Sequence, residues 1–365
     1  MRIENAHFRN LRNIKDCSLS FSPKANFILG PNGAGKSALL EGFYLMSRGR
    51  TFRGGSLESL INKDGESVSI RVKVEGDSGV SRELALEKKR REKSGVRLDT
   101  AACGLADVGR LLPVQLITPN STGLVYLGPE VRRSFLDWGL FHVEHGYLEL
   151  ARSYKKTLRQ RNAWLKSSVG VADPWVSKLS ELGAKINEFR RIYLERLRPA
   201  FEQINSSFSE VGPLGLEYLG GGYGSEPAEA LTLLNEAWRS DSKRGSTSIG
   251  PHTAEMKITL GGYPAKAICS RGQSKLLAFY LGVSQALDLR ASKQKGSVLL
   301  LDDIGSELDQ DALIECLELV NEINMQSFIT TTQTALSRRL LDVFGEHSVF
   351  HVKQGEFLKG NFYGD

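Results

Sequence analysis

Hydrophobic and polar residues alternate with different periods in different regions of the chain, which predicts two α/β segments separated by a helical one. Near the N-terminus, a short pair of strands precedes an apolar strand at Asn26–Leu29, a glycine-rich turn and a helix from about Lys36. Residues 66–100 alternate apolar and polar positions, as exposed antiparallel strands do, and Lys88–Lys93 is predicted to form a charged hairpin tip.

From about Val131 the pattern becomes helical. Apolar residues recur every three or four positions after Asp173, which predicts that this helix pairs antiparallel with the one before it. Residues 212–227 are rich in glycine and are predicted to be a loop or hinge. The α/β pattern then returns, with strands expected at Met256–Leu260, Val298–Leu301 and Ser327–Thr331 and helices expected from Gly272 and near Asp311–Asn324.

The composition is that of an ordinary globular protein with a sizeable core: of 365 residues, 41% are hydrophobic and 25% are charged. These values exclude a wholly disordered chain, a collagen-like chain and a small disulfide scaffold. No window approaches the ~20 apolar residues of a membrane span, the charged N-terminus has no apolar leader, and the four cysteines lie far apart. We therefore expect a soluble cytoplasmic protein with reduced thiols and no membrane partner.

Positive charge is concentrated in one segment. The formal net charge is +6, but residues 152–198 hold twelve Lys or Arg against four Asp or Glu, so the rest of the chain is slightly acidic. In the first predicted helix of this segment, one basic face consists of Arg152, Lys155, Lys156, Arg159 and Lys166. Such a face can be ordinary solvated surface or can contact nucleic-acid phosphates.

Residues 30–37 satisfy the pattern G-x-x-x-x-G-K-[ST] between a predicted strand and a predicted helix. In such a loop, backbone amides surround phosphate oxygens, the lysine reaches the β and γ oxygens, and the hydroxyl ligates Mg²⁺. The nucleotide-binding residues predicted in this loop are Gly30, Pro31, Asn32, Gly33, Ala34, Gly35, Lys36 and Ser37.

The apolar strand Val298–Leu301 ends in two carboxylates. Asp302 suits a Mg²⁺ site through a bound water, as a Walker B residue does, and Asp303 can orient or deprotonate an attacking water. Ser270–Gln273 precedes a predicted helix and can bind a γ-phosphate by hydroxyl, amide and helix dipole. The order of these motifs, followed by Ser306–Asp309, is that of the ABC ATPases.

Motifs from residue 8 to residue 309 resemble those of the RecF family of bacterial recombination mediators, in the same order. They are Phe8–Asn10, Gly30–Ser37, Leu40–Gly42, Gly49–Arg53, Pro129–Asp137, Gly250–His252, Ser270–Gln273 and Asp302–Asp309. The resemblance implies an α/β fold: a P-loop ABC-type ATPase head like that of SMC proteins, a mixed sheet with helices, split by an inserted helical arm. The implied domains are the N-terminal part of the head (1–125), the arm (126–248) and the C-terminal part of the head (249–365).

The resemblance also implies an ATP-dependent DNA-binding protein of recombinational repair, with ATP and Mg²⁺ as cofactors. An ATP-driven homodimer would clamp duplex or gapped DNA and hydrolyse ATP slowly, as a weak DNA-stimulated ATPase. With RecR and RecO it would help to load RecA at gaps, and so support replication and the SOS response.

Roles at the nucleotide follow residue by residue from the resemblance. Lys36 and Asp303 would be catalytic, and Ser37 and Asp302 would belong to the metal site. Gln115 is interpreted as a further metal ligand, because it lies on a strand-like segment that enters the insert.

The remaining implied contacts lie outside the P-loop and the acidic pair. Ser270 and Gly272 would contact the γ-phosphate bound to the other protomer, with Gln273 also on the nucleotide. Arg9 and Asn10 resemble the adenine-side contacts of SMC-type heads. The DNA contacts expected within a RecF-like frame are Arg152, Lys155, Lys156 and Arg159.

Three segments depart from the family pattern. The acidic run after Pro119 is replaced by Asn120-Ser121-Thr122, and the acidic tail after the Gly-Pro-His motif by Thr253-Ala254-Glu255. Where an ABC enzyme has a switch histidine after the last strand, this chain has Thr330-Thr331-Thr332, which leaves the γ-phosphate sensor unassigned.

Two other classes share part of this pattern. The ATPase subunit of a membrane transporter shares the nucleotide motifs, but its interval between Lys36 and Asp302 would be far shorter. A P-loop kinase for a small molecule explains the P-loop but gives Ser270–Gln273 no role. Long-armed SMC proteins are excluded, because an insert of about 120 residues in two antiparallel helices spans at most ~60–90 Å.

Overall fold

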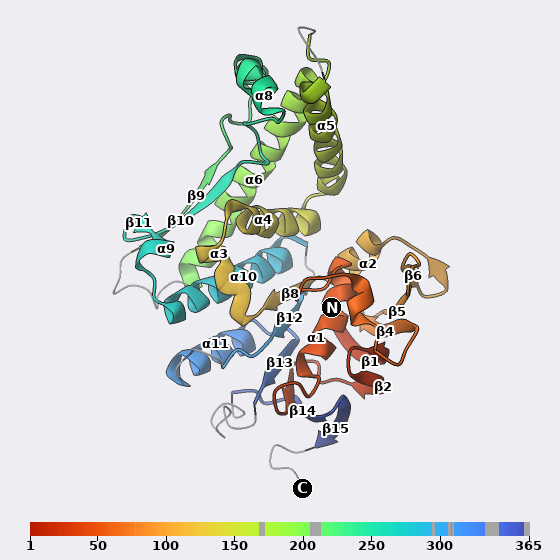
Figure 1. Ribbon diagram of the computed structural model, residues 1–365. Helices are drawn as coiled ribbons and strands as arrows, with labels where there is room; N and C mark the ends of the chain where they lie inside the picture. Colours follow the sequence, from red (N-terminus) through yellow and green to blue (C-terminus); the bar gives the residue numbers. More distant parts are fainter. Residues whose placement is uncertain are drawn as a thin grey trace. The chain divides into compact units, whose positions relative to one another are not determined.

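The computed structural model describes residues 1–76, 78–167, 172–204, 213–293, 296–305, 308, 310–332 and 343–360. Contacts divide the chain into two compact units (Figure 1). The first unit joins Met1–Ser121 to Arg271–Asp365, and the second unit is Thr122–Ser270. Of the motif Ser306–Asp309, all but Leu308 lie outside the described residues.

One sheet of the first unit is antiparallel, with the strand order β2-β1-β4-β5-β6-β7. Its strands are β1 (Arg2–Leu11), β2 (Ile14–Ser20), β4 (Ser67–Glu75), β5 (Ser81–Lys89), β6 (Gly95–Leu98) and β7 (Ala101–Ala102). Alternate residues of β4, from Val68 to Val74, are buried, so one face of the sheet packs on the core and the other faces solvent. The period-2 prediction for residues 66–100 is confirmed, and the turn between β5 and β6 is the predicted charged tip.

The other sheet of this unit is mixed, with the order β15-β14-β3-β13-β12-β8. Its strands are β3 (Ala25–Leu29), β8 (Val114–Ile117), β12 (Val298–Leu301), β13 (Ser327–Thr331), β14 (His347–Lys353) and β15 (Glu356–Gly360). All neighbours pair in parallel except β14 and β15. The strands β3, β12 and β13 are buried along their whole length, as parallel strands covered on both faces are.

Helix α1 (Lys36–Arg48) lies between the two sheets. The ring of Phe43 on α1 is 5.5 Å from that of Phe8 on β1 and 4.8 Å from that of Phe328 on β13, so one helix joins both sheets into one core. The other helices described in this unit are η1 (Leu57–Leu60), α2 (Leu105–Leu111), α10 (Arg271–Lys293) and α11 (Gln310–Glu322), and η2 (Pro119–Thr122) runs into the second unit.

The second unit is mainly helical. Its helices are α3 (Gly123–Tyr126), α4 (Pro129–Val143), α5 (Tyr147–Ser167), α6 (Val176–Ile204), α7 (Pro227–Glu236), α8 (Trp238–Arg244) and α9 (Ala265–Ile268). Helices α5 and α6 pack side by side (Figure 1), as the apolar periodicity predicts. A small sheet has the order β11-β10-β9, with β9 (Leu214–Leu219), β10 (Glu255–Leu260) and β11 (Tyr263–Pro264).

The prediction of a loop over residues 212–227 was wrong in part. Leu214–Leu219 is strand β9, which pairs antiparallel with β10 and buries Leu214 and Leu216. The glycines pointed to a loop, but the pairing partner lies about forty residues further on and overrides the local signal. In the described part of the chain, no helix is long and apolar enough to cross a bilayer.

Candidate nucleotide-binding site

A cavity of about 400 Å³ lies at the carboxyl ends of the parallel strands β3, β12 and β13. In open α/β sheets this edge is where ligands bind, since the loops that leave it carry the site. The lining comes from the P-loop and the start of α1, the β1–β2 turn, residues 52–53, the residues after β8, the acidic pair after β12, and Thr330 on β13. The P-loop residues in the lining are Asn32, Gly33, Gly35, Lys36 and Ser37.

The P-loop needs its glycines for two different reasons. At Gly30, an added Cβ would lie 2.4 Å from the carbonyl oxygen of Val352, so no side chain fits. Gly33 and Gly35 have φ angles of 78° and 120°, which L side chains rarely adopt. The strand–loop–helix context predicted for this motif is therefore present, with α1 beginning at Lys36.

The ammonium group of Lys36 lies over its own loop. Its Nζ donates hydrogen bonds to the carbonyl oxygens of Gly30, at 2.6 Å, and Pro31, at 3.0 Å. Burial lowers the pKa of Lys36, whereas the charges of Asp303 and Asp302 oppose that shift. Three cationic side chains (Arg12, Lys36 and Arg53) and two carboxylates thus line the same cavity, an arrangement suited to a magnesium–triphosphate group.

Ser37 and Asp302 meet across the cavity. Ser37 Oγ donates a hydrogen bond of 2.8 Å to Asp302 Oδ1. Two ligands at right angles around Mg²⁺, each at 2.0–2.1 Å, are separated by about 2.9 Å, so this oxygen pair fits two neighbouring positions of a magnesium shell. The ion would neutralise charge on the phosphates, held by Ser37 and, directly or through water, by Asp302.

The structure does not bring Arg9 and Asn10 to this cavity. Arg9 is exposed on β1, and Asn10 lies against Gly65. The β1–β2 turn contributes Arg12 and Asn13 instead. Strand residues face either side of their own sheet, whereas the turn reaches the P-loop.

Both turn residues are held by hydrogen bonds. Asn13 Nδ2 donates to the carbonyl oxygen of Ala34 at 3.0 Å, which ties the turn to the P-loop. Arg12 donates from Nε and Nη2 to the buried carboxylate of Glu41 on α1, at 2.9 and 3.0 Å. No sequence pattern marked this pair, because each contact joins segments that only the fold brings together.

Gln115 also lies away from the cavity lining. On β8 it is paired with Leu299, which lies three residues before Asp302, and its amide faces Gly282 on α10. The segment that reaches the carboxyl edge of the sheet comes later, at residues 118–120. The strand prediction is therefore confirmed, and the role of Gln115 as a metal ligand stays a prediction.

The predicted γ-phosphate contacts lie at the start of α10. Ser270 is exposed and directly precedes that helix, while Gly272 and Gln273 lie in its first turn. Gly272 and Gln273 are outside the lining of the cavity that holds Lys36.

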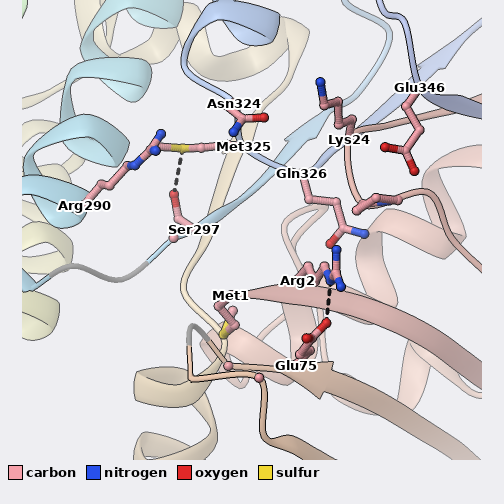
Figure 2. Close-up of a pocket in the computed structure, with 14 residues that line it drawn as sticks. Met1, Arg2, Lys24, Glu75, Arg290, Ser297, Asn324, Met325, Gln326 and Glu346 are labelled. Atoms are coloured by element: carbon pink, nitrogen blue, oxygen red, sulfur yellow. Dashed lines mark hydrogen bonds and ion pairs between the residues drawn. The ribbon is translucent and has the colours of Figure 1, made fainter.

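A larger cavity of about 740 Å³ lies at the opposite edge of the mixed sheet (Figure 2). It is lined by segments that precede β3, β12, β13 and β14, and its charged residues include Lys24, Arg290 and Glu346. Among the described residues that line it there is neither a P-loop nor an acidic pair at a strand end. The smaller cavity is therefore the better candidate for nucleotide chemistry.

The basic face predicted on α5 is exposed. Arg152, Lys155, Lys156 and Arg159 are all solvent-accessible, whereas Tyr154 and Thr157 on the other side of the helix are buried. This separation of charge from packing residues is what a surface that contacts phosphates needs.

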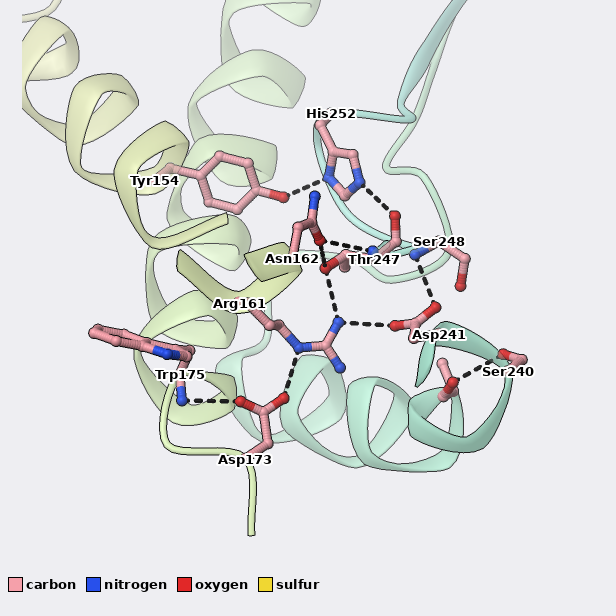
Figure 3. Close-up of polar contacts among 11 residues, drawn as sticks. Tyr154, Arg161, Asn162, Asp173, Trp175, Ser240, Asp241, Thr247, Ser248 and His252 are labelled. Carbon is pink, nitrogen blue, oxygen red and sulfur yellow. Dashed lines mark hydrogen bonds and ion pairs between the residues drawn. The ribbon is translucent and has the colours of Figure 1, made fainter. Parts of the chain in front are cut away.

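Arg161, on the same helix α5, is not part of that face. It is completely buried, and its Nε donates to Asp173 at 2.7 Å while its Nη1 donates to Asp241 at 2.8 Å (Figure 3). Thr247 Oγ1 accepts a further hydrogen bond at 2.8 Å. The guanidinium charge is therefore neutralised inside the second unit, so the basic excess counted along residues 152–198 overstates the surface charge.

The fold and the cavity define a P-loop ATPase head of the ABC and SMC class. Residues 1–355 match the family described as RecF/RecN/SMC N terminal domain. Sequence relatives place the chain more narrowly: it belongs to the RecF family.

Two relatives illustrate the match. The DNA replication and repair protein RecF of Pseudomonas aeruginosa (strain LESB58) is 33% identical over 352 residues, which cover 95% of this chain and 94% of that protein. The protein of the same description from Pseudomonas putida (strain GB-1) is 34% identical, with 96% of each covered.

Solved structures agree with the sequence relatives. A structure described as the recombination mediator protein RecF-ATP in the RecFOR pathway has a TM-score of 0.88 and 27% identity, and covers 98% of this chain and 97% of that one. An SMC head bound to the C-winged helix domain of ScpA has a TM-score of 0.59 at 13% identity, which supports the fold alone.

Proposed function

We propose that this chain is an ATP-dependent DNA-binding protein of recombinational repair that works as an ATP-driven dimer. The observation that carries the proposal is the meeting of Lys36, Ser37 and Asp302 at one edge of the mixed sheet, in a chain of the RecF family. The relative of known structure is described with ATP, so ATP is the nucleotide proposed, with Mg²⁺ at Ser37 and Asp302. This family membership disfavours the transporter and kinase alternatives.

The position of the signature residues supports the dimer. Gly272 and Gln273 are outside the cavity of their own chain, so they serve a nucleotide only if a second copy presents one. ATP between Lys36 of one subunit and Ser270 of the other would stabilise the closed dimer by its higher affinity for that state.

Hydrolysis would open the closed dimer. Asp303 would position the attacking water, and its side chain is one methylene shorter than the glutamate usual in ABC enzymes, which favours slow, weakly DNA-stimulated turnover. The exposed α5 face would contact duplex or gapped DNA. By family membership, RecR and RecO would be its partners in loading RecA, in the cytoplasm.

Binding to a gapped duplex tests the proposal, with ATP, with ADP and without nucleotide. The Asp303→Asn variant keeps the P-loop and holds ATP unhydrolysed, so it serves as the ATP-trapped form. We expect tight binding with ATP only, together with a doubling of the protein mass on the DNA. DNA binding that is indifferent to nucleotide would contradict the ATP switch, and a single copy on the DNA would contradict the dimer.

A further inference from the structure

Thr330 is a fully buried threonine on β13 whose side chain joins the lining of the nucleotide cavity. Its Oγ1 donates a hydrogen bond of 2.7 Å to Asp302 Oδ1. The same oxygen accepts a hydrogen bond of 2.9 Å from the backbone N–H of Asp303. One hydroxyl group on a neighbouring strand therefore contacts both acidic residues that follow β12.

The contact with Asp303 acts on the backbone. Asp303 has a φ angle of 50°, in the left-handed region that L residues rarely adopt. Its N–H is held in this conformation by Thr330 Oγ1. Thr330 therefore contributes to the backbone conformation from which the Asp303 side chain leaves the strand end.

The contact with Asp302 complements that of Ser37. Asp302 Oδ1 accepts from Ser37 Oγ at 2.8 Å and from Thr330 Oγ1 at 2.7 Å. Ser37 is itself a proposed metal ligand, whereas Thr330 has no such second role. Mutation of a group that holds a metal-ligating carboxylate in this way typically lowers metal affinity or activity by about 10- to 100-fold.

We propose that Thr330 is the positioning residue for both carboxylates, an inference that rests on the proposed ATPase function. Its hydroxyl donates to Asp302 and accepts from the backbone N–H of Asp303. At the strand end where ABC enzymes have a switch histidine, this chain therefore has a residue that orients the metal-site and water-positioning carboxylates.

The test compares Thr330→Val, which removes the hydroxyl at nearly constant volume, with Thr330→Ser, which keeps it. Thr331→Val is the matched control, because Thr331 is also buried on β13 but its hydroxyl donates to the backbone carbonyl of Thr332. Three quantities are measured on the full chain: ATP affinity in EDTA, the Mg²⁺ concentration that half-saturates the ATP complex, and kcat.

For Thr330→Val we expect metal-free ATP affinity within about twofold of wild type, because the P-loop is unchanged. The Mg²⁺ requirement rises roughly 10- to 100-fold and kcat falls by a similar factor. Thr330→Ser and Thr331→Val stay within about threefold of wild type. A Thr330→Val variant with wild-type Mg²⁺ dependence and kcat would overturn the inference, as would an equal effect of Thr331→Val.

A double variant keeps the test decisive if Thr330→Val also perturbs folding. In an Asp302→Asn background, Thr330→Val has no further effect on the Mg²⁺ requirement if Thr330 acts through that carboxylate. Additive effects of the two changes would overturn the inference. Failure of the wild type itself to bind or hydrolyse Mg²⁺–ATP would instead contradict the proposed function.

Discussion

Two buried aspartates, Asp302 in the first unit and Asp241 in the second, are satisfied by different kinds of donor. Asp302 accepts hydrogen bonds from the neutral hydroxyls of Ser37 and Thr330. Asp241 accepts from the charged guanidinium of Arg161. Hydroxyl donors leave the carboxylate charge available to a cation, whereas an arginine neutralises it within the protein. The identity of the donor thus distinguishes a carboxylate that can bind a ligand from one that stabilises the fold.

The largest expected effect comes from removing the arginine. Arg161→Met leaves Asp173 and Asp241 buried without their cation, which should destabilise the second unit by about 3–5 kcal/mol. Arg159→Met, on the exposed face of the same helix, should change stability by less than about 0.5 kcal/mol. Hydrogen exchange of α5 and α8 amides in the full chain measures both. Equal protection in the two variants would show that the ion pairs of Arg161 with Asp173 and Asp241 contribute nothing to stability.

The second effect concerns the P-loop lysine of the nucleotide cavity. Lys36→Ala should weaken ATP binding by roughly 10- to 100-fold, the equivalent of about 1.5–3 kcal/mol for a hydrogen bond to a charged group. It should also abolish ATP-dependent dimerisation, measured by the mass of the complex with and without ATP. Lys24→Ala, in the larger cavity of Figure 2, is the control and should change neither. A Lys36→Ala protein that still dimerises with ATP would contradict the proposed switch.

A smaller effect is expected on the α5 surface. Replacing Lys155, Lys156 and Arg159 by alanine should lower DNA affinity and reduce the slope of log K against log salt by ~0.9 for each phosphate that these side chains neutralise. Lys178→Ala is the control, because that ammonium is paired with Glu181 on α6. If the triple variant leaves the slope of log K against log salt unchanged, this face is ordinary solvated surface.

The smallest effect is a pH dependence within the second unit. His252 Nε2 faces the carbonyl oxygen of Thr247 at 3.0 Å, so it carries the proton, and Nδ1 accepts from the hydroxyl of Tyr154 at 2.7 Å. A second proton would disrupt the Tyr154 contact. Burial lowers the pKa of His252, with a smaller contribution from the charge of Arg133.

The sign follows from that lowered pKa. The unfolded state takes up the proton near the usual pKa of about 6.5, and the folded state takes it up only at lower pH. Neutral His252 therefore makes its full contribution to the free energy of unfolding above about pH 6.5, and this contribution is lost as the pH decreases. The free energy of unfolding should change by no more than about 1.4 kcal/mol per pH unit. Thermal unfolding of the full chain at pH 5.5 and 7.5 measures this change. His252→Gln should flatten the pH dependence of stability, whereas His145→Gln, at an exposed histidine, should leave that dependence unchanged. Identical curves for the wild type and both variants would refute this assignment.

Local patterns were sufficient to predict the elements that carry their own signal. Val298–Leu301 and Ser327–Thr331 have the bounds expected from their apolar runs, because a strand buried on both faces needs such a run. The P-loop was equally clear, since its glycines and lysine are adjacent in sequence.

What the sequence did not reveal depends on partners that are distant along the chain. Arg161 was counted among the cations of a basic segment, and its pairing with Asp173 and with Asp241, eighty residues away, emerges only from the fold. Arg12 and Thr330 reach the nucleotide cavity through a turn and a neighbouring strand, which no spacing encodes. That Gln115 lies outside the cavity lining was likewise not evident from the sequence, because the register of β8 is set by its pairing with β12.

The strand order of the mixed sheet has a consequence for synthesis on the ribosome. Ser37 and Asp302 are separated by 265 residues, and β3 is flanked by β13 and β14, both made much later. At 5–20 residues per second, the ribosome needs roughly 15–50 s to make the chain between them. During that time β3, the strand that leads into the P-loop, lacks both of its neighbouring strands. Helices α5 and α6, in contrast, can pair as soon as they emerge from the ribosome. A nascent chain paused after the helical insert therefore holds a packed helix pair but no nucleotide pocket.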